Sequence, residues 1–130
     1  MSWIKYLFYI CGFYGLLVIA ALYFRERAIA AAGLPGITYP EFFYGFIGVG
    51  LAWQLAFLVI GGDPLRYRPL ILVAVIEKIG FGLPAALLYK AGRIPAEMFA
   101  AGMLDLLMAV LFTIAWVQLG KAASSSPAAA

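Results

Sequence analysis

Four long runs of apolar residues occupy most of the chain, and short stretches rich in charge, proline and glycine separate them. The runs cover residues 3–24, 41–60, 70–89 and 96–119. Each holds roughly 20 residues, which as an α-helix span the roughly 30 Å hydrocarbon core of a bilayer. The apolar positions are continuous rather than alternating, which favours helices over the strands of a membrane barrel. The pattern therefore predicts an all-α fold, an antiparallel four-helix transmembrane bundle.

Helix boundary signals stand between the runs. Residues 38–41 (Thr-Tyr-Pro-Glu) have the pattern of a capping box with proline in the first turn, and residues 94–97 (Ile-Pro-Ala-Glu) mark another helix start. Gly92 suits a left-handed cap at the end of the third run, so the last two runs are expected to form a tight antiparallel hairpin. We expect a single membrane domain over residues 1–120 and a disordered tail over residues 121–130.

Composition agrees with a membrane protein and excludes several kinds of chemistry. Of the 130 residues, 66% are hydrophobic and 12% are charged, whereas soluble domains are about half apolar and about a quarter charged. The chain has no histidine and one cysteine, Cys11. It therefore lacks the residues for an intrachain disulfide, a structural zinc site, an iron–sulfur cluster, histidine-ligated haem or a Ser-His-Asp triad. No cofactor, metal or catalytic set is predicted.

The basic residues of the chain bear on its partners and its orientation. The net charge is only +3 and its lysines and arginines are scattered, so no nucleic acid partner is predicted. The expected partners are the lipid bilayer and another membrane protein or a second copy of the chain. Basic residues divide evenly between the two sides of the predicted topology, and the working expectation places both termini in the cytoplasm.

Polar residues inside the apolar runs are the candidates for function, because ionisable groups in a bilayer are costly. They are Tyr14, Gln54, Glu77, Lys78 and Asp105. Counted from the connecting loops, Gln54, Glu77, Lys78 and Asp105 lie at about one depth in an antiparallel bundle, and Tyr14, halfway along the first run, could join them. The apolar residues of the third run favour insertion by roughly 3 to 7 kcal/mol, and its two charges oppose it by roughly 5 to 7 kcal/mol. Lys78 is therefore expected to pair with Asp105, whereas Glu77, turned by about 100° on the helix, is expected to face Gln54 or Tyr14.

Small residues at four-residue spacing predict where the helices pack closely. The predicted stripes are Gly48, Ala52 and Ala56; Ala74, Lys78, Gly82 and Ala86; and Ala101, Asp105, Ala109 and Thr113. Gly12 and Gly15 offer a further close-packing face in the first run. Pro84 cannot donate to the carbonyl of Gly80 and predicts a kink one turn from the charges. The kink either lines a small cavity beside the ion pair or only improves packing.

The second connecting segment carries a motif. Residues 63–69 read DPLRYRP, and Glu77 and Lys78 follow in the next run. This D-P-x-R-[YF]-R-P…E-K pattern, together with the layout of four spans, resembles a family of small uncharacterised bacterial membrane proteins. It is similar, more distantly, to the DoxX-like group of four-helix membrane proteins. The resemblance implies a location in the bacterial cytoplasmic (inner) membrane and does not imply an activity.

The same segment has a physical interpretation of its own. Asp63 is expected to cap a short turn and to pair with Arg66. Tyr67 suits the headgroup level of the bilayer, and Arg66 and Arg68 suit contact with lipid phosphates. The segment is interpreted either as a membrane anchor or as a loop that docks a lipid or a partner.

Three functional hypotheses follow from these patterns. The leading one is a non-enzymatic accessory or assembly subunit, or a homo-oligomer, that acts by association. The alternative is a small-molecule or proton-linked transporter or ligand-binding protein that uses Glu77, Lys78 and Asp105. A third is acid–base catalysis on an apolar substrate by Glu77 or Asp105.

Overall fold

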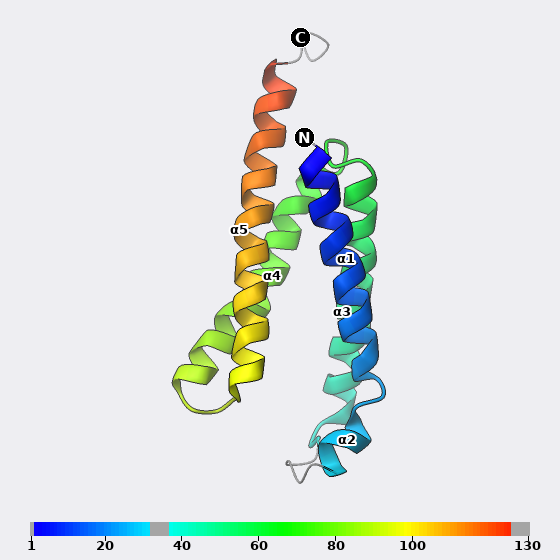
Figure 1. The fold of residues 1–130 in the computed structure, drawn as a ribbon, viewed down its shortest axis with the longest axis vertical. Coiled ribbons are helices and arrows are strands. Elements are labelled where there is room, and N and C mark those ends of the chain that lie inside the picture. The colour runs from blue at the N-terminus through cyan, green and yellow to red at the C-terminus, as the bar shows by residue number, and fades with distance from the viewer. Residues whose placement is uncertain (1, 32–36, 126–130) are drawn as a thin grey trace. The chain divides into compact units, whose positions relative to one another are not determined.

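The computed structural model describes residues 2–31 and 37–125, and over these residues the protein is helical and contains no strand. The helices are α1 (Ser2–Leu22), α2 (Glu26–Ala31), α3 (Pro40–Gly62), α4 (Arg68–Lys90) and α5 (Ala96–Ser125) (Figure 1). All except the short α2 are long and apolar enough to span a membrane. The all-α prediction with four membrane-length helices is therefore confirmed.

The chain divides into two compact units, Met1–Gly62 and Asp63–Ala130. The first unit contains a hairpin of α1 and α3 with α2 between them, and the second contains a hairpin of α4 and α5. Each hairpin is considered by itself below. The packing of both hairpins into one four-helix bundle stays a prediction.

In the first hairpin, α1 and α3 run antiparallel. Near the start of α1, a methyl group added at Gly61 would lie 3.0 Å from the ring of Tyr9. Just beyond the end of α1, the ring of Tyr23 stacks on that of Tyr44 with centroids 6.0 Å apart. Rising residue numbers in α1 thus meet falling numbers in α3, as a hairpin requires (Figure 1).

Glycines of α1 form the close-packing face that the sequence predicts. Gly12 and Gly15 are buried against α3, and Gly15 lies directly under the side chain of Gln54. The predicted stripe on α3 does not face α1, however, because Gly48 and Ala52 are exposed. Ala52 is two residues from Gln54 and hence about 200° away around the helix. Its stripe therefore lies on the side of α3 opposite α1.

The turn between α4 and α5 ends α4 as predicted. Gly92 has the positive φ of 70° that a left-handed cap requires. The backbone N–H of Arg93 donates to the carbonyl of Leu88, and that of Gly92 donates to the carbonyl of Tyr89, each over 2.9 Å. This pair of bonds is a Schellman motif. Beyond it, Phe99 of α5 stacks on Tyr89 with ring centroids 4.3 Å apart, which closes a tight antiparallel hairpin.

Helix starts are displaced slightly from the predicted caps. Because α3 begins at Pro40, the residue before its first helical position is Tyr39 rather than the predicted Thr38. The Tyr39 carbonyl accepts the first backbone hydrogen bonds of the helix. Likewise α5 begins at Ala96, one residue after Pro95. In both places proline stands at the boundary, where its missing N–H leaves no helical bond unmade.

The C-terminal end of α5 differs from the expectation. Residues 121–125, predicted as part of a disordered tail, continue the helix to Ser125. The hydroxyl of Ser124 donates to the carbonyl of Gly120 within this last turn. The remainder of the predicted tail, residues 126–130, lies outside the described residues.

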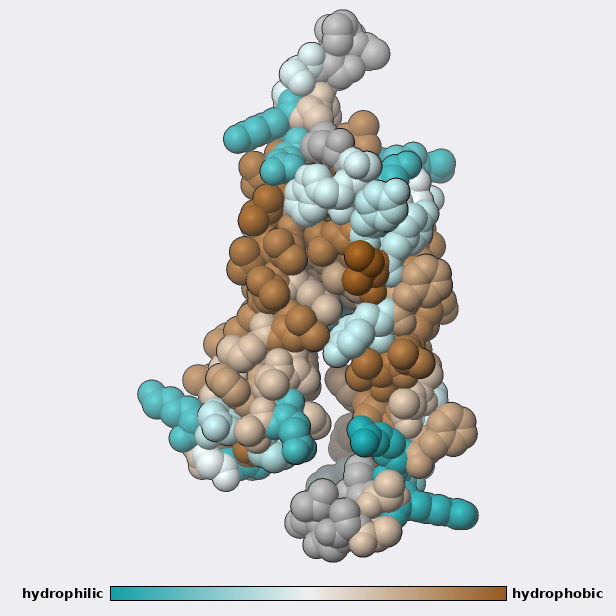
Figure 2. Space-filling model, viewed as in Figure 1, coloured by the Kyte–Doolittle hydropathy of each residue, from teal (hydrophilic) through white to brown (hydrophobic). Residues whose placement is uncertain are grey.

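The surface of each hairpin agrees with a lipid environment. In Figure 2, hydrophobic surface covers the middle of each hairpin, and hydrophilic residues gather towards its ends. Large apolar side chains point outward on every long helix, among them Leu17 of α1 and Ile76 of α4. Water would penalise so much exposed apolar surface, whereas acyl chains would not. The chain is thus compatible with an integral, multi-pass membrane protein.

Candidate functional site

A cluster of three charged side chains lies inside the second hairpin. Lys78, in the middle of α4, is only 5% exposed. Its Nζ donates a hydrogen bond to Asp105 Oδ1 of α5 over 3.3 Å, and it lies 3.5 Å from Oε2 of Glu77. The predicted ion pair between Lys78 and Asp105 is therefore confirmed, and it joins the two helices of the hairpin.

Small residues on α4 allow the helices to approach around this pair. Ala74 and Gly82, one turn before and after Lys78, are buried on the same face, as the predicted stripe requires. A methyl group added at Gly82 would lie 2.6 Å from the Leu106 side chain and 2.8 Å from the backbone carbonyl of Gly102. The two backbones thus lie close together next to the charges, a geometry that any larger residue at Gly82 would prevent.

On α5 the packing face is rotated from the predicted stripe. Ala109 is buried as expected, but Ala101 and Thr113 are exposed. Gly102 takes the place of Ala101, since a methyl group there would lie 2.5 Å from Cβ of Ala85. Asp105 therefore approaches Lys78 from one side of the interface rather than from its centre.

Glu77 makes a contact with Lys78 that the sequence analysis did not predict, whereas its expected position facing Gln54 or Tyr14 stays a prediction. The helical period turns its Cα about 100° from Lys78, yet its carboxylate reaches back to the same ammonium group. The flexible side chain spans this angle because an isolated charge in an apolar environment costs more than a bent rotamer. Among the described residues, Glu77 Oε2 is a buried atom that has no hydrogen-bond partner. The contact of this oxygen with Lys78 is ionic, over 3.5 Å.

The charge count of the cluster is its main chemical feature. Two carboxylates share one ammonium, so with all three groups ionised the cluster carries one net negative charge. In an apolar layer such a surplus calls for a proton or for a positive group supplied from outside. The described residues contain no set of three or more histidine, cysteine or acidic side chains placed to hold a metal ion.

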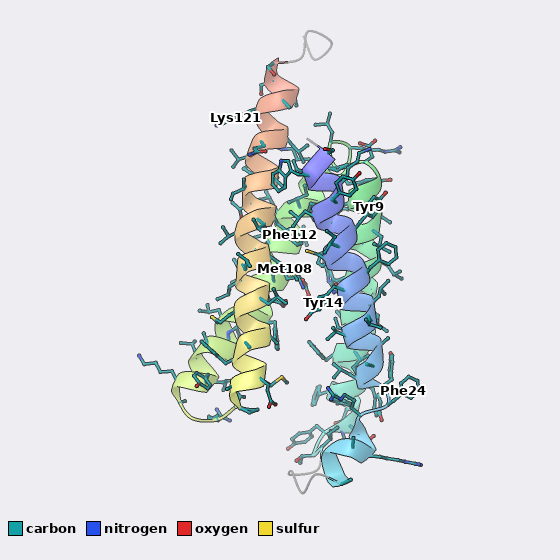
Figure 3. The ribbon with its side chains drawn as sticks, viewed as in Figure 1. Tyr9, Tyr14, Phe24, Met108, Phe112 and Lys121 are labelled. Carbon is teal, nitrogen blue, oxygen red and sulfur yellow. The ribbon has the colours of Figure 1, made fainter. Side chains whose placement is uncertain are left out.

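Gln54 and Tyr14, the other predicted members, belong to the first hairpin. Gln54 is 1% exposed, and its Nε2 donates to the carbonyl of Gly50 in its own helix over 3.1 Å. Its side chain covers Gly15 so closely that a methyl group at Gly15 would overlap the amide. Tyr14, labelled on α1 in Figure 3, is exposed. Their convergence with Glu77, Lys78 and Asp105 stays a prediction.

Pro84 and Gly80 lie on the outside of the α4–α5 hairpin, away from the ion pair. The helix α4 is continuous across Pro84. Both Pro84 and Gly80 are exposed, and a methyl group added at Gly80 would meet nothing within 4 Å. By the helical period both lie on the side of α4 opposite Lys78. The carbonyl that Pro84 leaves without its helical donor thus points away from the α4–α5 interface.

The loop before α4 contains the predicted cap. The backbone N–H of Arg66 donates to Asp63 Oδ1 over 3.2 Å. Asp63 and Arg66 therefore interact as expected, but through the backbone N–H of Arg66 and not through its side chain. Its guanidinium lies instead over the ring of Tyr67, 5.6 Å from the centroid. These contacts give the loop a defined turn at the entrance to α4.

Arg68 has a structural role that the sequence analysis missed. Its Nε donates to the carbonyl of Trp116 in α5 over 2.9 Å, and its Cζ lies 4.2 Å from the centre of the Trp116 ring. Gly120 leaves room for this guanidinium, because a methyl group there would overlap it. The sequence could have predicted this contact, because Arg68 and Trp116 lie equal numbers of residues before and after Gly92, where the hairpin turns. Arg68 therefore ties the start of α4 to α5 and is not simply a side chain in a lipid-facing loop.

A second missed feature lies at the α2 end of the first hairpin. The hydroxyl of Tyr44 donates to the Glu26 carboxylate, and Tyr23 stacks on Tyr44. With Phe24 and Arg27 these residues line a surface hollow. The hydrogen bond holds α2 against the start of α3.

Comparison of the chain with protein-family models, with curated proteins and with solved structures gave no match.

Proposed function

We propose that the chain is a non-enzymatic, multi-pass protein of the bacterial cytoplasmic membrane that acts by association. It serves as an accessory or assembly subunit of another membrane protein, or it forms a homo-oligomer. Four membrane-length apolar helices support the membrane location. The resemblance of the DPLRYRP segment to small four-span bacterial proteins supports the choice of membrane, and the cytoplasmic placement of both termini belongs to the same proposal.

The observation that carries the association hypothesis is the face of α3 opposite α1. Gly45, Gly48 and Ala52 share this face by the helical period and are exposed. A methyl group added at Gly45 would meet nothing within 4 Å. Small residues of this kind let a further helix approach closely, and a face that met only lipid would gain nothing from them. Within the first hairpin this face is uncovered at Gly45 and Ala52, while a methyl group added at Gly48 would lie 3.7 Å from the Tyr23 hydroxyl.

The charged cluster supports the same conclusion from the other hairpin. Lys78 is already engaged by two acids inside the α4–α5 hairpin, so it is poorly placed to bind a substrate. The surplus negative charge, by contrast, suits a basic or hydrogen-bonding side chain from a neighbouring helix. Both hairpins thus present features that a partner helix would complete.

Purification in mild detergent tests the proposal. The wild-type protein is expected to carry another membrane protein in stoichiometric amount or to form a particle of several chains. Light scattering during size-exclusion chromatography, with peptide identification of the peak, measures both. Ala52→Phe places a bulky ring on the uncovered face of α3 and is expected to reduce the particle to a single chain with unchanged helix content.

Leu17→Phe is the matched control, because it adds a ring at an exposed position of α1 in the same hairpin. It is expected to leave the particle mass unchanged. A wild-type protein that is a lone 14.1 kDa chain with no companion contradicts the proposal. So does an Ala52→Phe particle that keeps the wild-type mass.

The second candidate function is proton-linked transport or ligand binding at the cluster. It is favoured by the two carboxylates around one ammonium and by the buried Glu77 oxygen that has no hydrogen-bond partner among the described residues. Glu77→Gln removes the surplus charge and keeps the shape of the side chain. Transport predicts that this variant loses proton-coupled uptake in proteoliposomes and keeps its particle mass. Association alone predicts no proton-coupled uptake by either protein.

A further inference from the structure

We propose that the hollow at the C-terminal end of α5 binds the phosphate of an anionic phospholipid. The inference goes beyond the proposed function and rests on it only for the membrane location; the hollow lies at the end of the hairpin opposite the α4–α5 turn. It rests on a surface hollow of the second unit lined by Arg68, Trp116, Val117, Gly120, Lys121, Ser124 and Ser125.

The charged residues that line this hollow are all basic. Arg68 and Lys121 both line it, and no acidic residue is among its described lining. They come from different helices, because Arg68 begins α4 whereas Lys121 lies in the last turns of α5 (Figure 3). Two basic side chains along one hollow, with no acid among its described lining, attract an anion. The loop residue Arg66, which sequence analysis paired with Arg68 as a phosphate contact, is not part of it.

The guanidinium of Arg68 is held in a fixed position within the hollow. Its Nε donates to the Trp116 carbonyl over 2.9 Å, and its Cζ lies over the Trp116 ring, 4.2 Å from the centroid. That hydrogen bond uses one of the five N–H donors of arginine, and the other four belong to the two terminal nitrogens. A guanidinium already held in place loses little conformational entropy when it binds a phosphate, whose oxygens match its fork of donors.

Gly120 makes this arrangement possible. A methyl group at this position would lie 2.9 Å from Cζ of Arg68 and would overlap a terminal nitrogen. With glycine, the guanidinium can lie on the backbone of α5, next to Lys121. The hydroxyls of Ser124 and Ser125 each donate to a carbonyl of α5, so the donors for a phosphate come from Arg68 and Lys121 and the serines only add polar surface to the hollow.

The depth of the hollow favours a lipid headgroup over a soluble anion. The 30 residues of α5 extend about 45 Å, which exceeds the hydrocarbon core by several turns. Arg68 stands at the first residue of the membrane-length α4, so the hollow lies where the apolar part of the hairpin ends. Tryptophan and basic side chains at such a boundary meet the phosphates of the bilayer.

Native mass spectrometry of the full chain in detergent tests the site. Phosphatidylglycerol and phosphatidylcholine with the same acyl chains are titrated separately, and the apparent affinity is measured for each. Lys121→Gln is expected to weaken phosphatidylglycerol binding by about fivefold, the effect of one basic residue near the lipid surface, and to leave phosphatidylcholine binding unchanged. Arg68 is not substituted, because it also joins α4 to α5.

Lys90→Gln is the matched control, since it removes the same charge at the turn end of the hairpin. It is expected to change phosphatidylglycerol binding less than twofold. Gly120→Ala displaces the guanidinium without removing a charge and is expected to weaken binding as Lys121→Gln does. Equal losses in Lys121→Gln and Lys90→Gln, or equal affinity for the two lipids, overturn the proposal. Displacement of phosphatidylglycerol by millimolar inorganic phosphate overturns it as well, because the ligand is then a soluble anion.

Discussion

The α1–α3 and α4–α5 hairpins both bring antiparallel helices together over glycine, but they place different polar groups at the contact. In the first hairpin the neutral amide of Gln54 covers Gly15. In the second, Lys78 of α4 meets Asp105 of α5 and the neighbouring Glu77. Similar backbone contacts thus accommodate an amide in one hairpin and three charges in the other.

The difference shows which polar groups find a hydrogen-bond or ionic partner within their own helix and which need the other helix of the hairpin. Gln54 donates to the carbonyl of Gly50 in its own helix, so its hydrogen bond survives if α1 moves away. Lys78 depends on a carboxylate from α5 and one from α4, and separating the helices removes the first of these. The charged side chains should therefore stabilise the contact between α4 and α5 strongly, whereas Gln54 should stabilise the contact between α1 and α3 only weakly.

The largest effect is expected for Lys78→Met. This change leaves the carboxylates of Glu77 and Asp105 close together without a counter-charge, and breaking a buried ion pair in this way costs about 3 to 5 kcal/mol. Unfolding of the purified protein by sodium dodecyl sulfate, followed by circular dichroism, measures the loss. Adding Glu77→Gln and Asp105→Asn to Lys78→Met should restore most of the stability, because no uncompensated charge then remains.

Lys121→Met provides the reference for loss of a lysine that is exposed on α5, and it should change the free energy of unfolding by less than about 0.5 kcal/mol. Were Lys78→Met no more destabilising than this reference, the contrast between the two hairpins would have no energetic basis.

An intermediate effect is expected for alanine at the glycine contacts, and it should differ between the hairpins. Gly82→Ala brings a methyl group 2.8 Å from the Gly102 carbonyl, which is backbone and cannot turn aside, so about 1 to 3 kcal/mol should be lost. In Gly15→Ala the atoms nearest to the added methyl group belong to the side chain of Gln54, which can change rotamer, so this variant should cost less. Both are measured by the same detergent unfolding.

Gly80→Ala serves as the control for these two variants, since its methyl group would have open space and alanine favours helix over glycine by about 1 kcal/mol. It should be neutral or stabilising. An equal loss in Gly15→Ala and Gly82→Ala would mean that the side chain of Gln54 is as immovable as backbone.

The smallest effect is expected for Gln54→Leu. It removes one hydrogen bond within α3, and polar contacts between membrane helices average only about 0.6 kcal/mol in cycle measurements. The free energy of unfolding should fall by no more than about this amount. A loss that approaches that of Lys78→Met would show that Gln54 satisfies a group outside its own hairpin, as its predicted place in the charged cluster implies.

Much of the fold and part of the site follow from residue type and spacing alone. Four apolar runs of membrane length predict four helices, and the short connection around Gly92 predicts the second hairpin. Because the hairpin turn sets the register, the nearly equal distances of Lys78 and Asp105 along the chain from Gly92 also predict that these two residues meet. These features depend on local backbone geometry and on the high cost of an unpaired charge in lipid, both of which act on any chain with this pattern.

Only the tertiary structure decided which face of each helix is used and how the flexible side chains resolve their contacts. It turned Gly48 and Ala52 away from α1, brought the Glu77 carboxylate back to Lys78, and placed Arg68 on Trp116 and Gly120. The physical reason is that several faces of these helices are almost equally apolar, so the hydrophobic pattern scarcely distinguishes them. Close van der Waals fit and the reach of long charged side chains make the choice, and both depend on atoms from two helices at once.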